Sequence, residues 1–146
     1  MIPNFLAFVR SFVAHKRGNV LMIFAFAAIP MVFATGMGID YSRAARLRTK
    51  LNAIADAAAL AAVSQPAMNN PSDTDATNTA KTMFNAQAEG LDGLDGEPQV
   101  TIGITHPDGV TSRIVTVSYT AKSVNTFGAV LNMHAIPIGG TSSATA

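Results

Sequence analysis

Cysteine and tryptophan are absent from the sequence, and charged residues are few. Without cysteine, the chain cannot form a disulfide framework, a thiolate metal site or a cysteine nucleophile. Charged residues make up 13% of the 146 positions and the formal net charge is +1, which gives no overall electrostatic basis for binding nucleic acid. The chain is instead rich in apolar residues, because 49% of its positions are hydrophobic.

The motifs that usually identify an enzyme or a metal site are also missing. The three histidines, His15, His106 and His134, are far apart, and no HExxH motif, P-loop or nucleophile elbow occurs. The two Asp-Gly pairs within Asp92–Gly96 fit tight turns better than a calcium loop, which needs more oxygen ligands at regular spacing. We therefore expect a protein that is not an enzyme and has no catalytic residues, cofactor or metal.

The longest apolar stretch lies near the N-terminus. From Val20 to Ile39 every residue is apolar or small, apart from the hydroxyl of Thr35. Twenty residues at a rise of 1.5 Å make a helix about 30 Å long, which matches the hydrocarbon core of a bilayer. The pattern predicts a transmembrane helix at about residues 20–39. A buried helix of a soluble protein and a cleaved secretory signal are the alternatives.

Three residues within this stretch affect its shape and its packing. Pro30 removes a backbone hydrogen bond, and a membrane helix tolerates the resulting kink. Gly36 and Gly38 allow a neighbouring helix to approach closely, although their spacing is not that of a GxxxG motif. The flanking basic residues are Arg10, Lys16 and Arg17 on one side and Arg43, Arg46, Arg48 and Lys50 on the other. Because the two sides are nearly balanced, charge alone does not set the orientation.

Helical periodicity extends on both sides of the apolar stretch. Residues 4–13 fit either a short helix in the headgroup plane or a disordered leader. On the other side no proline or glycine intervenes before Pro66, so we expect one helix from about Asn19 to Ser64. Its outer half presents a narrow apolar stripe that changes from large to small residues: Leu47, Leu51, Ile54, Ala58 and Ala61. We expect this stripe to pack on the C-terminal part of the chain, with packing on another helix as the alternative.

The C-terminal part predicts a small α+β unit. A loop is expected at residues 65–78, followed by a second helix at 77–91. That helix places Ala80, Met83, Phe84 and Ala88 on one face. Alternating apolar residues at 99–105 and 112–122, joined by a His-Pro-Asp-Gly turn, predict a β-hairpin.

The last segment predicts one more helical turn and one more strand. A short helix is expected at residues 125–133. Residues 134–146 are expected to form a third strand, and Pro137 restricts that strand to a sheet edge or an irregular region. The complete pattern is an α+β fold in which a long membrane helix continues into a small domain.

Asp40 is the first acidic residue after the apolar stretch. It can pair with Arg43 one helical turn on, an interaction that contributes about 0.2 to 0.5 kcal/mol when exposed. A structural anchor at the membrane surface and a contact with a basic group of a partner are the two roles we consider for it.

Several short motifs occur in a characteristic order. In the first half they are Arg17-Gly18-Asn19, Pro30, Asp40-Tyr41-Ser42-Arg43, Leu51, and the run from Ala55 to Ala62. In the tail they are Thr126-Phe127, Ile136-Pro137-Ile138 and the closing Ala-Thr-Ala. This series resembles TadE/TadG-like proteins of the Flp (tight-adherence) pilus system. The candidate membrane-exit and helix-packing residues are Pro30, Gly36, Gly38, Asp40, Tyr41 and Arg43.

The resemblance implies a non-catalytic, single-pass protein of the bacterial inner membrane that assembles, anchors or initiates an adhesive pilus. Residues 1–18 would form a cytoplasmic leader, residues 19–65 the membrane helix and its continuation, and residues 66–146 a small periplasmic domain with a pilin-like layout. The implied partners are membrane lipid and other pilus proteins: pilins, pseudopilins or the inner-membrane platform. The long helix would carry any homo- or hetero-oligomer.

The chain departs from the family pattern in two ways. Larger TadG-like members carry a von Willebrand A-like domain after this region, and none is expected within these residues. Processed pilins are cut after a glycine and carry glutamate at the fifth mature position, whereas cleavage between Gly18 and Asn19 would place Ile23 there. A minor pilin cleaved at this site, and a membrane-anchored adhesin or sensor unrelated to pili, are the alternative functions.

Overall fold

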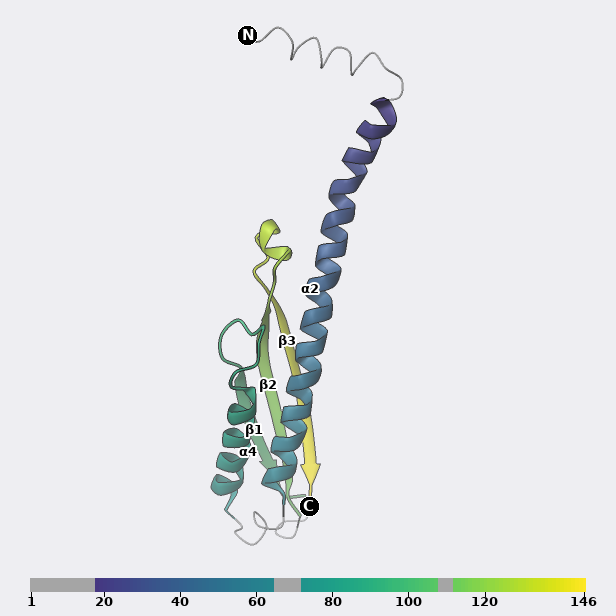
Figure 1. Ribbon diagram of the computed structural model, residues 1–146. Coiled ribbons are helices and arrows are strands. Elements are labelled where there is room, and N and C mark those ends of the chain that lie inside the picture. The colour runs from purple at the N-terminus through teal and green to yellow at the C-terminus, as the bar shows by residue number, and fades with distance from the viewer. Residues whose placement is uncertain (1–17, 65–71, 108–111) are drawn as a thin grey trace. The chain divides into compact units, whose positions relative to one another are not determined.

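The computed structural model describes residues 18–64, 72–107 and 112–146 (Figure 1). The leader helix considered at residues 4–13 lies outside this range, as does part of the predicted turn after His106. The chain divides into two compact units, residues 1–38 and residues 39–146. The elements are helix α2 (Gly18–Ala62), helix α4 (Asp73–Ala88), strand β1 (Gln99–Thr105), strand β2 (Ile114–Val124), the 3₁₀ turn η1 (Gly128–Leu131) and strand β3 (Ala135–Thr145).

In the first unit, the described residues belong to helix α2. The helix is long and apolar enough to cross a membrane: its most apolar window of 18 residues has a mean hydropathy of 2.2, and only 6% of that window is buried. Pro30 lies inside the helix. The hydroxyl of Thr35 donates to the carbonyl of Met31 at 2.9 Å, so the one polar side chain between Val20 and Ile39 is satisfied within the helix.

In the second unit, three antiparallel strands form a sheet in the order β1-β2-β3. Gln99 lies opposite Thr120, and Ile114 lies opposite Thr145. The predicted hairpin and third strand are therefore confirmed. Strand β3 is an edge strand that contains Pro137, as expected for a residue that cannot donate to a sheet ladder.

One face of the sheet and two helices enclose the core of this unit. Val115, Val117 and Tyr119 alternate along β2 on the covered face, and the Tyr119 ring lies 5.8 Å from the ring of Phe84 on α4. Helix α2 contributes Leu47, Leu51, Ile54, Ala55, Ala58, Ala59 and Ala62 to the same core. The α+β fold class is confirmed, and so is the predicted packing of the stripe for Leu47, Leu51, Ile54 and Ala58. Ala61 is only partly buried, and Ala62 takes its place in the core.

Close approach between α2 and β3 depends on glycine. A Cβ added at Gly140 would collide with the Asn52 side chain and would lie 3.0 Å from the Tyr119 ring. The Tyr119 hydroxyl donates to Asn52 Oδ1 at 2.6 Å. Burial raises the pKa of Tyr119, and the charge of Arg48 lowers it in part. The hydroxyl therefore stays protonated and can donate this hydrogen bond.

Two details of the second helix were predicted wrongly. Helix α4 begins at Asp73 and not at residue 77, because Ser72 caps it by accepting a hydrogen bond from the backbone of Asp75. The two acidic residues of the first turn also suit a helix N-terminus. The buried face is Ala76, Ala80, Phe84 and Ala88, whereas Met83 is exposed.

Candidate functional site

Asp40 is the buried polar group that connects helix α2 to the β2–β3 loop. Its Oδ1 accepts a hydrogen bond from the backbone N–H of Thr126 at 3.0 Å. Its Oδ2 accepts two more, from Phe127 and Gly128, each at 2.8 Å. Only 2% of Asp40 is exposed to solvent. A carboxylate bound by three consecutive N–H groups is a charge-assisted arrangement that fixes both partners.

The same contact completes the start of the 3₁₀ turn η1. No side chain of its own segment caps this turn, so its first N–H groups need acceptors from elsewhere. Asp40 supplies those acceptors from a position more than eighty residues away in the sequence. Asp40 therefore holds the start of this turn to the helix.

Internal hydrogen bonds give the loop its own shape. The backbone N–H of Asn125 donates to the carbonyl of His134 at 2.9 Å, and the Asn125 side chain donates to the carbonyl of Met133 at 3.0 Å. Asn132 adopts a left-handed conformation with φ of 61° at the end of η1. A Cβ at Gly128 would lie 2.6 Å from the Asn125 amide nitrogen, so the loop requires glycine there.

Arg43 adds a second connection between the helix and the loop. Its guanidinium donates to the hydroxyl of Thr126 at 2.9 Å, so its hydrogen bond goes to the loop and not to the Asp40 carboxylate. Burial by itself raises the pKa of Asp40, but the N–H groups of Gly128, Thr126 and Phe127 and the charge of Arg43 lower it. The net effect is a pKa below the ordinary value, so Asp40 is ionised at neutral pH.

The other predicted site residues do not join this cluster. Tyr41 is 71% exposed beside Asp40. Pro30 and Gly36 lie in the helical residues of the first unit. A Cβ at Gly38 would meet no atom within 4 Å. Gly18 and Asn19 form the first residues of helix α2, and whether the chain is processed between them stays a prediction.

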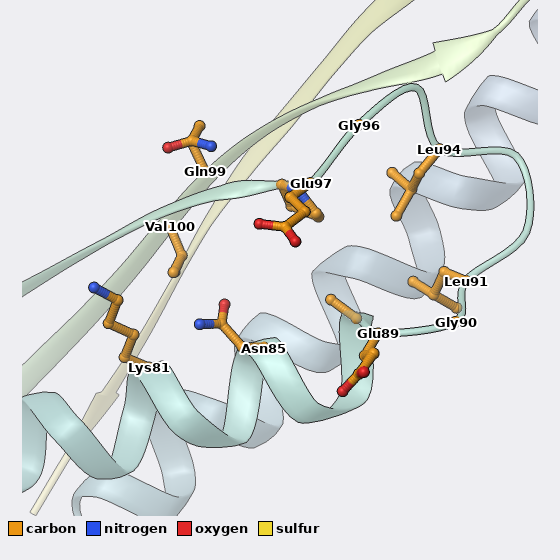
Figure 2. Close-up of a pocket in the computed structure, with 12 residues that line it drawn as sticks. Lys81, Asn85, Glu89, Gly90, Leu91, Leu94, Gly96, Glu97, Gln99 and Val100 are labelled. Carbon is orange, nitrogen blue, oxygen red and sulfur yellow. The ribbon is translucent and has the colours of Figure 1, made fainter.

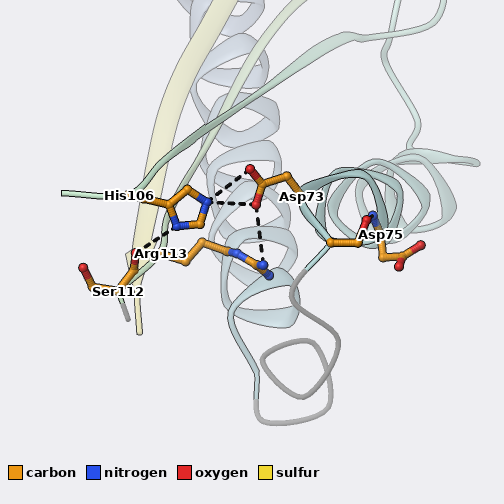
Figure 3. A network of polar contacts seen from close by, with 6 residues as sticks. Asp73, Asp75, His106, Ser112 and Arg113 are labelled. Atoms are coloured by element: carbon orange, nitrogen blue, oxygen red, sulfur yellow. Dashed lines mark hydrogen bonds and ion pairs between the residues drawn. The ribbon is translucent and has the colours of Figure 1, made fainter. Parts of the chain in front are cut away.

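A second polar network connects α4 to the sheet (Figure 3). His106 Nε2 lies 2.9 Å from Asp73 Oδ1, and His106 Nδ1 lies 3.0 Å from the carbonyl of Ser112. Arg113, which is 3% exposed, reaches Asp73 at 3.5 Å. Each ring nitrogen of His106 thus faces an oxygen acceptor, and the network joins the start of α4 to both strands of the hairpin. We assign it a structural role.

An open pocket of about 770 Å³ lies between α4 and the segment that leads into β1 (Figure 2). Lys81 and Asn85 line it from α4, Glu89 from the position that follows the helix, and Glu97 and Val100 from the other side. In the described part of the chain no group of three or more histidine, cysteine or acidic residues could hold a metal ion.

The sequence alone did not predict the Asp40–loop contact. Asp40-Tyr41 and Thr126-Phe127 were both recognised as motifs, but as separate segments. Gly128 signals only close packing within its own loop, because a Cβ there would lie 3.0 Å from the carbonyl of Met133. The long sequence separation hid the partner.

The fold and this contact define a class of protein. The apolar stretch of helix α2 is followed by a buried acid, and the part of the helix beyond it contributes to the core of a small α+β unit. Residues 18–65 match the family model described as "Putative Flp pilus-assembly TadE/G-like". The chain therefore carries a TadE/G-like region, and the predicted resemblance is confirmed for these residues. No curated protein and no solved structure shows significant similarity to the chain.

Proposed function

We propose that this protein is a non-catalytic, single-pass component of Flp/Tad pilus assembly in the bacterial inner membrane. Residues 20–39 span the bilayer with the N-terminus in the cytoplasm, and the second unit lies in the periplasm. The protein anchors or initiates the pilus by packing its membrane helix beside pilins, pseudopilins or the assembly platform. The family match over residues 18–65 supports the pilus assignment.

The Asp40 contact is the observation that supports an anchoring role. The acid follows Ile39, the last residue of the apolar stretch, and it binds the loop between β2 and β3. A force on this loop is therefore transmitted through Asp40 to helix α2, directly after the apolar stretch. Three charge-assisted hydrogen bonds are well suited to resist such a displacement.

Deletion of the gene tests the pilus assignment, and complementation tests the site. We expect deletion to remove surface pili, counted by electron microscopy, and the wild-type gene to restore them. Asp40→Asn should restore fewer pili than wild type, because an amide nitrogen cannot accept the N–H groups of Phe127 and Gly128. Asp92→Asn, which changes an exposed acid, is the matched control. Normal piliation after deletion would favour an adhesin or sensor unrelated to pili.

Protease treatment of spheroplasts tests the topology. Digestion of the second unit in intact spheroplasts is expected, with the membrane helix protected. Protection of the second unit under these conditions would contradict a periplasmic location.

A minor pilin that enters the filament is the second candidate function. Its support is the pilin-like layout, in which the outer half of a long N-terminal helix packs on an antiparallel sheet. Mass spectrometry of the mature N-terminus separates the two candidates. Asn19 as the first residue would favour the minor pilin, and an intact leader would favour the membrane component.

A further inference from the structure

Exposed apolar side chains in the second unit gather in two segments. Nine large hydrophobic residues of its described part are exposed, and seven of them lie within residues 39–41 and 124–133. The seven are Ile39, Tyr41, Val124, Phe127, Val130, Leu131 and Met133. Val130 is the most exposed of these, at 72%. Exposed apolar residues that gather in this way usually mark a surface that binds a protein, a ligand or a membrane.

The Asp40 hydrogen bonds bring these two segments together. Asp40 lies between Ile39 and Tyr41 in the chain, and it binds Thr126, Phe127 and Gly128 directly. Figure 1 shows that the loop with η1 extends past the end of the sheet that lies opposite the C-terminus. The apolar surface of the loop is therefore next to the residue at which the predicted membrane span ends.

The loop is suited to a low-dielectric environment. From Val124 to His134 the sequence contains no aspartate, glutamate, lysine or arginine. Several of its N–H groups are already bonded within the loop, including Val130 to Phe127, Asn132 to Ala129 and Met133 to Gly128. Satisfied backbone groups reduce the cost of moving a non-helical segment into the interface of a bilayer.

The neighbouring residues of α2 fit the headgroup layer. Tyr41 is exposed, and aromatic residues of this kind are enriched where a helix leaves the bilayer. Arg43 and Arg46 lie about 5 and 9 Å beyond Asp40 along the helix axis, and both are exposed. Cations at this depth attract anionic lipid headgroups.

We propose that residues 127–133 form a second membrane contact, in which the tip of the loop inserts into the lipid interface. The occupant of this surface is the bilayer itself, rich in anionic headgroups, and not a protein partner. The inference rests on the proposed membrane span at residues 20–39. Together the span and the loop hold the second unit to the bilayer at two points.

Tryptophan fluorescence tests this contact, because the chain has no tryptophan of its own. The full-length protein is reconstituted into vesicles of phosphatidylethanolamine and phosphatidylglycerol, with and without brominated acyl chains. Val130→Trp reports on the loop and Phe26→Trp on the predicted span. Leu60→Trp is the matched control, because Leu60 is 62% exposed but lies about 30 Å along the helix axis from Asp40. Leu131→Trp provides a second loop probe if Val130→Trp fails to fold.

We expect the emission of Val130→Trp to shift to shorter wavelength and to be quenched by brominated lipid nearly as strongly as that of Phe26→Trp. Leu60→Trp should show neither effect. If the Phe26 probe is quenched and the loop probe behaves like Leu60→Trp, the loop contact is wrong and the membrane span stands. If the Phe26 probe is not quenched, the span and the loop contact both fail. A loop signal that requires other pilus proteins would also overturn lipid as the occupant.

Discussion

The two parts of helix α2 use apolar residues in different ways. Up to Gly38 large apolar side chains are exposed, and they include Phe24, Phe26 and Ile29 at 60% or more exposure. After Asp40 the buried residues are mostly alanine, and they face the sheet of the same chain. Large exposed side chains suit a solvent of lipid, whereas small buried ones allow a backbone to approach closely. Along one continuous helix, the residue type therefore changes at the buried acid Asp40.

The largest expected effect comes from removing a core ring. Phe84→Ala should lower the free energy of unfolding of the second unit by about 3 to 5 kcal/mol, because the ring is fully buried. Denaturant titration of the full chain in detergent, followed by circular dichroism, measures the change. Phe26→Ala removes the same ring where it is 74% exposed, so the unfolding of the second unit should not change. Equal losses in both variants would remove the distinction between the two parts.

A charge placed in the apolar stretch tests whether the first part of α2 inserts into a membrane. Ile29→Arg should cost about 2.5 to 3.5 kcal/mol in membrane insertion, the amount expected for arginine near the centre of a span. Leu60→Arg adds the same charge to an exposed position of the second unit and should leave insertion unchanged. Glycosylation-based insertion assays with a lumenal acceptor site measure both. An unaffected Ile29→Arg would show that this stretch does not span the membrane.

A smaller loss of stability is expected where helix α2 closely approaches strand β3. Gly140→Ala should destabilise the second unit by about 1 to 3 kcal/mol, because the added methyl collides with Asn52 and crowds Tyr119. Gly103→Ala is the matched control, since its Cβ would lie 4.0 Å from Thr116 in the same sheet. Thermal unfolding of both variants tests the difference. A Gly140→Ala variant as stable as Gly103→Ala would mean that α2 packs less closely on β3.

Local patterns in the sequence were enough to predict most of the fold. Period-two alternation at Val115, Val117 and Tyr119 predicted both the strand and its buried face, because strand side chains alternate by geometry. The run of twenty uncharged residues predicted the candidate span, because a helix of that length matches the hydrocarbon core of a bilayer. The start of α4 was missed because Ser72 and Asp73 were assigned to a loop by composition, although the same residues suit a helix cap.

The site could not be predicted in the same way, because its partners are distant in the sequence. The sequence showed that Asp40 needed a partner at the end of the apolar stretch, and Arg43 was the local choice. Backbone N–H groups occur in every residue except proline, so no side-chain pattern identifies Thr126, Phe127 and Gly128 as donors. Only the fold of the β2–β3 loop places them at the carboxylate.

The smallest expected effect is a pH-dependent change in stability caused by Asp40, which lies at the junction between the two parts of α2. The pKa of Asp40 is below its ordinary value of 3.8, so the ionised acid stabilises the folded state above that value. This stabilisation is lost only as the pH falls through the lower pKa of the folded state. The difference in unfolding free energy between wild type and Asp40→Asn should therefore be constant from about pH 7 to pH 5 and should shrink below about pH 4. Denaturant titrations at each pH provide the measurement. A difference that already declines between about pH 7 and pH 5 would mean that the N–H groups of the loop do not hold the ionised acid.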